Sequence, residues 1–251
     1  MQQITIGHDS EFGLVKGGEI ISALNVFNDM VFEDENGRYF ADNMNVEIAI
    51  NPVTTLKDFH GKTEGLLGHV RGLGYEPLMQ PVIKYDDKYL SHPLAKISGC
   101  NPDFNAYSEG ENNAPDFTTM DGTRSCGAHI HAQLDGANPF WFARWMDMLV
   151  ALPLLQYEEK SDRRSLYGGA GCLRVKPYGG EYRTLSNVWL GDKARREFVW
   201  AMTHKAVALT HTTDPSTVDE WVDVPTAIDT HDVELAQRCI DRLYLYGVTQ
   251  V

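Results

Sequence analysis

Cysteine is scarce in this chain, and the cysteines present lie far apart. They form no CxxC pair and no zinc-ribbon spacing, which argues against a structural zinc site and against a disulfide framework. We therefore expect free thiols in a reducing compartment. No thiol stands out as a nucleophile, so the cysteines beside the motifs below are expected to have packing roles. The four are Cys100, Cys126, Cys172 and Cys239.

Long apolar runs are also missing. The most apolar segment, Phe140 to Leu155, is shorter than a membrane span and contains Arg144 and Asp147. We predict a buried helix there and no membrane association. The first residues, MQQITIGHDSEFGL, have neither a basic n-region nor an apolar h-region, so no secretion signal is expected. The predicted location is the cytoplasm.

The chain has no excess of basic residues. Its 35 acidic and 22 basic side chains give a formal charge of -13. This balance opposes a broad nucleic-acid surface and a basic membrane-binding surface, but it leaves room for a nucleotide or another small anion held by local arginines. Neither a Walker sequence nor a GxGxxG sequence between a strand and a helix is present, so glycine spacing alone identifies no phosphate site.

Apolar patterns predict strands spread unevenly along the chain, with helices between them. Such spacing favours an antiparallel or mixed sheet backed by helices over regular βαβ alternation. The predicted class is α+β, with a single domain over residues 1–251. The expected strands are Ile4 to Leu14, Ile20 to Val26, Tyr39 to Ile50, Pro81 to Tyr85, Ser125 to Leu134, Leu173 to Val175 and Glu181 to Leu185. The expected helices follow caps at Thr54 or Thr55, Asn138, Asp192 and Asp232, and the expected loops are 98–121 and 156–171.

Polar side chains recur two residues apart inside four of these strands. Positions i and i+2 of a strand project to the same side, roughly 6.5–7 Å apart. A sheet that points charged groups to one side cannot bury that side as an apolar core, because unpaired buried charge is costly. The pattern therefore predicts a surface that holds metal and anions. The pairs are Asp9/Glu11, Asn45/Glu47, His129/His131 and Glu181/Arg183.

The acidic pairs have the ligand type that Mg²⁺ and Mn²⁺ prefer. Asp9 and Glu11 provide two hard oxygen ligands on one strand, and Glu47 adds another carboxylate before an apolar run. Both acidic pairs also have a purely structural interpretation. The first pair would be a solvated strand edge, and Asn45 with Glu47 would be a surface turn that leads into a core strand.

The histidine pair and the ExR pair suit metal and phosphate contacts. One of His129 and His131 would ligate a metal, while the other would hydrogen-bond a phosphoryl group. The alternative is one structural histidine beside an exposed one. Arg183 beside Glu181 would grip a carboxylate or phosphate with two N–H groups, or would form a simple ion pair. Further arginines surround the YGGAG segment, where glycines let backbone N–H groups approach an anion.

In this order the motifs resemble the glutamine-synthetase-like superfamily, which includes glutamate–cysteine ligases. More narrowly, the chain resembles the phage-encoded carboxylate–amine ligases of that superfamily. The segments that carry the resemblance are GHDSEFGL, ADNMNVEIAINP, GAHIH and RRSLYGGAGCLRVKPYGGEYRTLSN. They run from about residue 5 to about residue 190, and the helices expected after them match only in kind.

The resemblance implies an antiparallel sheet whose concave face holds two or three Mg²⁺ or Mn²⁺ ions between ATP and an acidic substrate. It also places His131 near the transferred phosphate and gives Arg183 a grip on substrate or phosphate. Asp9 stands where glutamine synthetases carry glutamate, which leaves the number of ions open. The implied metal ligands are Asp9, Glu11, Glu47, His129 and Glu181, and the implied nucleotide contacts are Arg163, Arg164, Arg174 and Arg183.

The implied activity is an ATP-dependent ligase that forms an amide through an acyl phosphate. A carboxylate is a poor electrophile, and phosphorylation converts one of its oxygens into a leaving group. The general base is Asp42, Glu47 or a loop carboxylate such as Asp103, and the residue types do not choose among them. The partners would be small-molecule or peptide carboxylates and amines, in the host cytoplasm if the protein is phage-encoded. The sequence leaves open whether the protein forms an oligomer.

Three other functions fit parts of the pattern. The HIH strand followed by Gly136 is similar to a cupin motif, but a cupin-like metal enzyme has no use for the DxE strand or the arginines. A guanidine kinase-like phosphotransferase would stop at phosphoryl transfer. A catalytically inactive module would bind nucleotide without releasing phosphate.

Overall fold

The protein is described by a computed structural model that covers residues 4–96, 103–112, 121–219, 222–245 and 247–248. Helices and a large antiparallel sheet make up this part of the chain, which confirms the predicted α+β class. Across the large sheet the strand order is β3 (Phe32–Asp34), β4 (Gly37–Asp42), β5 (Asn45–Ile50), β1 (Ile6–Lys16), β10 (Ala128–Gln133), β12 (Gly179–Tyr182), β11 (Cys172–Lys176) and β8 (Phe104–Asn105).

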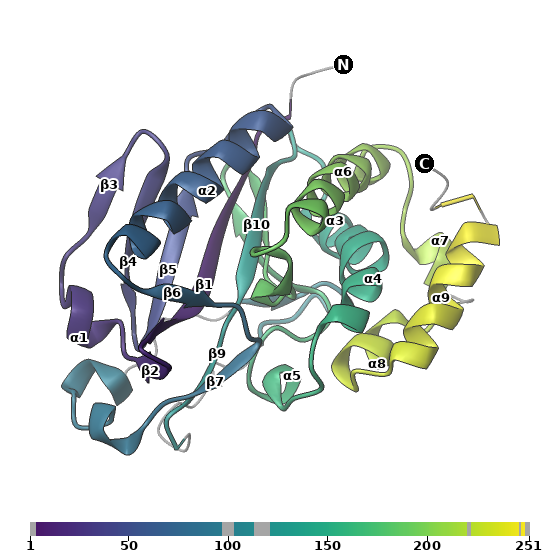
Figure 1. The fold of residues 1–251 in the computed structure, drawn as a ribbon. Coiled ribbons are helices and arrows are strands. Elements are labelled where there is room, and N and C mark those ends of the chain that lie inside the picture. Colours follow the sequence, from purple (N-terminus) through teal and green to yellow (C-terminus); the bar gives the residue numbers. More distant parts are fainter. Residues whose placement is uncertain (1–3, 97–102, 113–120, 220–221, 246, 249–251) are drawn as a thin grey trace.

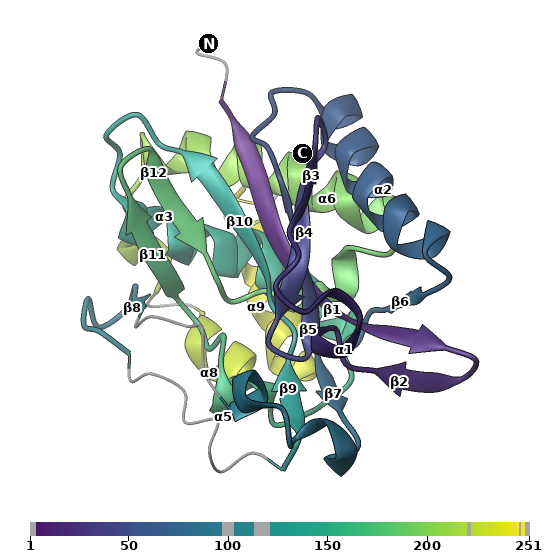
Figure 2. The ribbon, with the colours of Figure 1, turned by 90° about the vertical axis from the view of Figure 1, so that its left-hand side faces the viewer.

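Further strands extend or flank this sheet. The long strand β1 also pairs with β2 (Glu19–Ile21) and with β6 (Glu76–Leu78) at its C-terminal end. A separate ladder joins β7 (Val82–Lys84) to β9 (Thr123–Ser125). The described pairings are all antiparallel. Figure 2 shows how the β3–β4 hairpin and the β11–β12 hairpin stand on opposite sides of β1 and β10.

Three helices cover one side of the sheet (Figure 1). They are α2 (Leu56–Gly72), α3 (Pro139–Met146) and α6 (Lys193–Thr210). After α3 the chain continues as a π-helix, η4 (Asp147–Ala151), then α4 (Leu152–Leu154) and η5 (Leu155–Tyr157). The remaining helices are α1 (Leu24–Phe27), η1 (Asp87–Tyr89), η2 (Pro93–Lys96), α5 (Arg163–Leu166), η6 (Asn187–Trp189), α7 (Ser216–Asp219), α8 (Val224–Asp229) and α9 (Val233–Leu245). None of the helices in the described ranges is long and apolar enough to cross a membrane.

Side-chain caps begin the main helices where the sequence predicted them. The Thr55 hydroxyl accepts a hydrogen bond from the backbone N–H of Asp58 at 3.1 Å. The Asp192 carboxylate accepts one from the N–H of Arg195 at 2.8 Å. Such caps satisfy N–H groups that have no partner inside the helix. Asn138 and Asp232 cap α3 and α9 in the same way.

The main core lies between the sheet and these helices. Alternate residues of the central strands, such as Val46, Ile48 and Ile130, are fully buried there. Phe59 of α2 and Trp145 of α3 fill the helix side of the same cluster. Because side chains alternate along a strand, burying this side leaves the intervening polar residues on the opposite side.

Some element predictions were wrong. The stretch from Tyr39 to Ile50 is a hairpin of two strands, because Asn43 adopts a positive φ of 56° and turns the chain. The predicted strand from Ile20 to Val26 ends early and gives way to α1, and α5 lies inside a predicted loop. The predicted loop 98–121 lies partly outside the described residues.

Candidate functional site

The register of the sheet brings the polar motifs to one side. Asp9 of β1 lies opposite His129 of β10, and Glu11 lies opposite Glu47 of β5. Directly opposed residues of an antiparallel pair project to the same side. The predicted same-side projection is therefore confirmed, on the side away from α2, α3 and α6. We call this side the polar face; its charged and histidine residues include Asp9, Glu11, Asp42, Glu47, His129, His131, Arg174, Lys176, Glu181 and Arg183.

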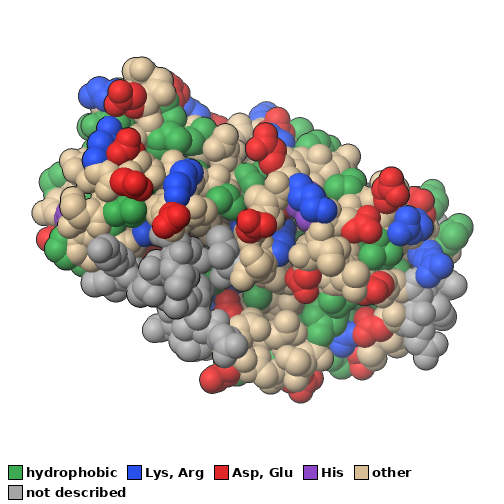
Figure 3. Space-filling view, turned by 90° about the horizontal axis from the view of Figure 1, so that it is seen from below, with side chains coloured by type: hydrophobic (Ala, Val, Ile, Leu, Met, Phe, Trp, Pro, Cys, Tyr) green, Lys and Arg blue, Asp and Glu red, His purple; other side chains and the backbone are tan. Residues whose placement is uncertain are grey.

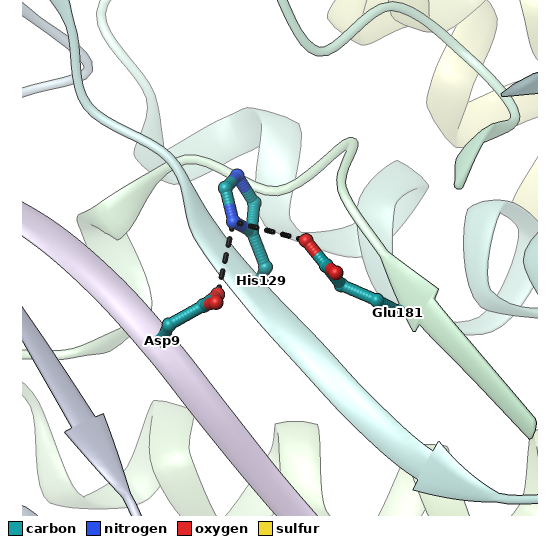
Figure 4. A group of neighbouring side chains, drawn as sticks. All are labelled: Asp9, His129 and Glu181. Atoms are coloured by element: carbon teal, nitrogen blue, oxygen red, sulfur yellow. Dashed lines mark ion pairs between the residues drawn. The ribbon is translucent and has the colours of Figure 1, made fainter. Parts of the chain in front are cut away.

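Three of these side chains meet at the centre of the polar face (Figure 4). Asp9, His129 and Glu181 come from three neighbouring strands, and we call them the histidine cluster. Nδ1 of His129 lies 2.9 Å from Oδ1 of Asp9 and 3.8 Å from Oε1 of Glu181. The other carboxylate oxygen of Asp9 lies 3.0 Å from Nε2 of His131. Asp9 thus links both histidines of the HxH motif.

The contacts inside the histidine cluster leave polar atoms without hydrogen bonds. Oδ1 of Asp9 is buried and has no hydrogen-bond partner among the described residues. Nε2 of His129 also has none there, but it lies on the far side of the ring, next to Gly127, and not between the two carboxylates. The approach of Oδ1 to Nδ1 is therefore close without being an aligned hydrogen bond. Buried polar atoms are normally satisfied, so this arrangement fits a missing partner such as a divalent cation.

The charge of Asp9 is set by its histidine neighbours. Burial would raise the pKa of Asp9, but the interactions with His129 and His131 outweigh burial and hold this pKa well below its usual value. Burial lowers the pKa of His129, and the positive charge of Arg183 lowers it further. An ionised carboxylate beside a neutral imidazole is the protonation state that metal ligands require.

A second group of carboxylates lies beside the first. Glu11, Asp42 and Glu47 come from β1, β4 and β5, and each offers an oxygen within 4.8 Å of the others. We call them the acidic cluster. Glu11 is held in place by the N–H of Gly127, 3.3 Å from Oε2. Three hard oxygen ligands in one place suit Mg²⁺ or Mn²⁺.

The acidic cluster is electrostatically unfavourable without a cation. Burial, and then the charge of Asp42, raise the pKa of Glu11 to about 8. Burial and the charges of Asp9, Asp42 and Glu11 raise the pKa of Glu47 well above its usual value. The pKa of Asp42 is raised by burial and by Asp9. A bound divalent cation would offset this repulsion and keep the three groups ionised.

Basic side chains gather on the other half of the polar face. Nζ of Lys176 lies 2.7 Å from Oε2 of Glu181, and Nη1 of Arg174 lies 3.6 Å from Oε1. Arg183 also donates to Glu181 through Nη1. We call Arg174, Lys176 and Arg183 the basic cluster. Three cations around one carboxylate leave an excess of positive charge, which suits an anion such as a phosphoryl group.

The side chains of Arg163 and Arg164 do not bind residues of the polar face; their partners are backbone carbonyls and Glu158. The buried Arg163 donates to the carbonyl oxygens of Thr184 and Leu185, each at 2.8 Å. Burial, and then the charge of Arg164, lower its pKa to about 10. Nη2 of Arg164 donates to both carboxylate oxygens of Glu158, at 2.9 and 3.0 Å. The structure does not bring these two arginines together with the basic cluster; they hold the chain that follows Arg183.

Asp103 lies at the edge of the basic cluster. Its Oδ2 is 3.5 Å from Nε of Arg183, and its Oδ1 accepts a hydrogen bond from the Asn112 amide at 2.8 Å. Of the proposed general bases, Asp42 and Glu47 therefore lie in the acidic cluster and Asp103 lies beside an arginine. Burial raises the pKa of Cys126 and of Cys172, which disfavours a thiolate at either. Cys100 lies outside the described residues.

The sequence reasoning missed one member of the acidic cluster and one member of the basic cluster. Asp42 was considered only as a base, although a two-residue turn after it places it opposite Asn45 and on the side of Glu47. Lys176 was not considered, although it lies two residues after Arg174 in the same strand. Recognising the two hairpins would have found both.

The comparisons with known proteins point to one family. The model of the family described as phage phiEco32-like COOH.NH2 ligase-type 2 matches residues 121–222. This confirms the narrower resemblance, to the phage-encoded carboxylate–amine ligases, over less than half of the chain. The match includes His129, Arg174, Glu181 and Arg183 and excludes Glu11. The family's name indicates a ligase that joins a carboxylate to an amine. A search of curated proteins gave no match.

Proposed function

We propose that the chain is an ATP-dependent carboxylate–amine ligase with the glutamine-synthetase-like catalytic fold. The observation that carries the proposal is the division of the polar face into an acidic cluster and a basic cluster, with the histidine cluster between them. Phosphoryl transfer needs cations beside the phosphates and arginines on the transferred group. Few other reactions of a carboxylate need both a cation site and an arginine site.

Two steps would convert the substrates. A carboxylate oxygen attacks the γ-phosphorus of ATP, the bond to the β,γ-bridging oxygen breaks, and ADP leaves. The amine nitrogen then attacks the acyl carbon, inorganic phosphate leaves, and the amine gives up one proton to a base. In this proposal Arg183 and Arg174 bind oxygens of the transferred phosphoryl group, and Lys176 adds charge beside them.

His131 would hold the transferred group from the other side. Its two ring nitrogens contact Oδ2 of Asp9 at 3.0 Å and the Tyr178 hydroxyl at 2.6 Å. These contacts fix the ring, and one ring nitrogen would exchange its partner for a phosphoryl oxygen. Glu47, Asp42 or Asp103 would accept the proton of the amine.

The acidic and histidine clusters would hold two or three Mg²⁺ or Mn²⁺ ions. When bound, such ions neutralise phosphate charge and polarise the reacting oxygens. The ligands proposed from the sequence were Asp9, Glu11, Glu47, His129 and Glu181, and the geometry adds Asp42. Arg163 and Arg164 are left out of the nucleotide site because their guanidinium groups bind backbone and Glu158.

The test is hydroxylamine trapping. The protein is incubated with ATP, MgCl₂ or MnCl₂, hydroxylamine and a panel of amino acids, dicarboxylic acids and peptides, and hydroxamates and ADP are detected by mass spectrometry. A ligase forms one hydroxamate per ADP. A kinase forms ADP and a phosphorylated product but no hydroxamate, and an inactive module releases no ADP. Tightly bound iron without any response to nucleotide would favour a cupin-like enzyme.

Two variants test the site itself. Glu11→Gln and Glu47→Gln keep the side-chain size but remove a charge from the acidic cluster, and each should lower turnover by at least about 100-fold. Glu76→Gln, at an exposed position of β6, is the matched control and should keep full turnover. Full activity in both acidic-cluster variants would refute the proposed site.

A further inference from the structure

A cavity of about 410 Å³ opens on the polar face next to the histidine cluster. Its floor includes Gly7 and Ala49, where the long polar side chains of the neighbouring positions are missing. One wall is formed by Asp9 and His131, and the facing wall includes Arg38. The sequence motifs and the mechanism above assign no role to this cavity or to Arg38.

The register sets the distance between the two walls. Arg38 of β4 lies opposite Ala49 of β5, and Ala49 lies opposite Asp9 of β1. Arg38 and Asp9 are therefore two strands apart on the same side, which corresponds to roughly 10 Å between their backbones. With a small residue between them, the two charged side chains face the same open space from opposite sides.

The wall that carries Arg38 is held in place before any ligand binds. The β3–β4 turn is closed by Asp34, which accepts a hydrogen bond from the N–H of Asn36 at 2.8 Å. Gly37 follows with a φ of 143°, and a Cβ there would lie 2.1 Å from the carbonyl oxygen of Ala49. The Arg38 guanidinium lies over the Phe40 ring, 5.5 Å from its centre. Preorganisation of this kind lowers the entropy that binding costs.

The lining of the cavity matches a ligand with a carboxylate at one end and an amine at the other. No ion pair joins Arg38 to another described residue, so its two-pronged donor is available for a carboxylate. Glu33 lies directly opposite Arg38 and also lines the cavity, and it disfavours a second anionic group on that wall. At the other wall, Asp9, His131 and Tyr178 line the cavity and offer polar partners to an amine.

We propose that this cavity binds the amine substrate of the ligase, and that this substrate is an amino acid or short peptide with one carboxylate. Arg38 binds the carboxylate, and the amine points to Asp9 and His131, beside the histidine cluster. The inference rests on the proposed function for the identity of the reaction, but the binding site stands on the cavity alone. It excludes ammonia and simple alkylamines as the preferred amine.

Binding is tested by calorimetry in MgCl₂ without ATP. The probes are glycine, β-alanine, 4-aminobutyrate and glycylglycine, each compared with its C-terminal amide, which keeps the amine and removes the carboxylate charge. The series also measures the separation of the two charged ends that fits best. We expect at least one acid to bind with a Kd below about 10 mM and at least about tenfold more tightly than its amide.

Variants test whether the ratio of acid affinity to amide affinity depends on the cavity. Arg38→Gln should make the acid and its amide bind equally, and Ala49→Leu should fill the floor and abolish binding of both. Arg71→Gln, at an exposed arginine on the other side of the sheet, is the matched control and should keep the wild-type ratio. Unchanged thermal unfolding shows that each variant is folded.

The outcomes separate this inference from the proposed function. Failure of every acid to bind, or an acid-to-amide ratio unchanged by Arg38→Gln, overturns the inference even if hydroxamates form in the trapping assay. Acid binding that depends on Arg38 supports it even if no hydroxamate forms, in which case the proposed function fails alone.

Discussion

Glu11 and Glu47 face each other directly across β1 and β5, on the side of the sheet that carries Asp42. Two carboxylates in this position repel each other unless a cation or a proton lies between them. The raised pKa of each reflects burial first and the neighbouring carboxylates next. This pair therefore gives the most direct test of a cation in the acidic cluster.

Glu47→Gln should stabilise the protein in EDTA and destabilise its metal-bound form. Without metal, Glu47 must either carry a charge beside Glu11 and Asp42 or hold a proton against its usual pKa, and the amide does neither. We therefore expect a gain of about 1 kcal/mol, or a rise in Tm of roughly 2–4 °C. With MgCl₂, the wild-type protein should gain stability and the variant should gain less. Differential scanning fluorimetry in EDTA and in MgCl₂ measures both, with Glu76→Gln as the charge-matched control. Equal responses to MgCl₂ in variant and wild type would contradict a cation at this place.

Arg183 should not tolerate lysine. Its guanidinium contacts Glu181, lies 3.2 Å from His129 and approaches Asp103, so it fixes three members of the polar face at once. A lysine keeps the charge but loses the planar set of donors. We expect Arg183→Lys to lower kcat by about 100-fold while KM for ATP changes less. Steady-state kinetics on the trapping reaction decide this. A variant with normal kcat would show that Arg183 acts only as a structural ion pair.

Arg163 should be a stability residue. It is 1% exposed and satisfies the carbonyl oxygens of Thr184 and Leu185. Arg163→Met keeps much of the volume but removes a charged donor from each carbonyl, although Thr184 still accepts from Arg164 and Leu185 still accepts from the N–H of Ala128. We therefore expect a loss of about 2 kcal/mol in the free energy of unfolding. Urea unfolding gives this value, and KM for ATP of the folded variant should stay near wild type. A large rise in KM with little loss of stability would instead restore the phosphate role first predicted for it.

Asp147 should make the protein less stable as pH rises. It is fully buried in the π-helix, where it contacts the Tyr182 hydroxyl and accepts a hydrogen bond from the N–H of Gly171 at 2.7 Å. Burial raises its pKa from 3.8 to about 7. The folded protein thus holds this proton more tightly than the unfolded chain, so the stabilisation is complete below about pH 4 and is lost as pH rises through 7.

The size of this effect can be measured by comparing the wild-type protein with the Asp147→Asn variant. The shift corresponds to roughly 4 kcal/mol between pH 4 and pH 8. Asp147→Asn imitates the protonated acid, because its amide can donate to Tyr182 while its oxygen accepts from Gly171. Urea unfolding at several pH values should show the wild-type protein losing stability relative to the variant as pH rises. A constant difference between them would show that Asp147 does not titrate in this range.

Much of the candidate site could be predicted from strand periodicity alone. Asp9 with Glu11 and His129 with His131 lie two residues apart in strands, so each pair had to share a side whatever the rest of the fold. Which strands are neighbours could not be read in the same way. Asp42 and Lys176 were missed because their relation to Glu47 and Glu181 depends on where two hairpins turn.

The local order of residues determined the side on which each polar pair projects, the caps at Thr55 and Asp192, and the resemblance to a ligase family. The first two features depend on contacts within a few residues, and the resemblance depends on the order of short motifs, so the chain encodes all three directly. Only the tertiary structure decided that β1 lies between β5 and β10, so that Glu11 meets Glu47 and Asp9 meets His129. It also decided that Arg163 is buried against backbone, because partners distant in sequence depend on how the whole sheet and its helices pack.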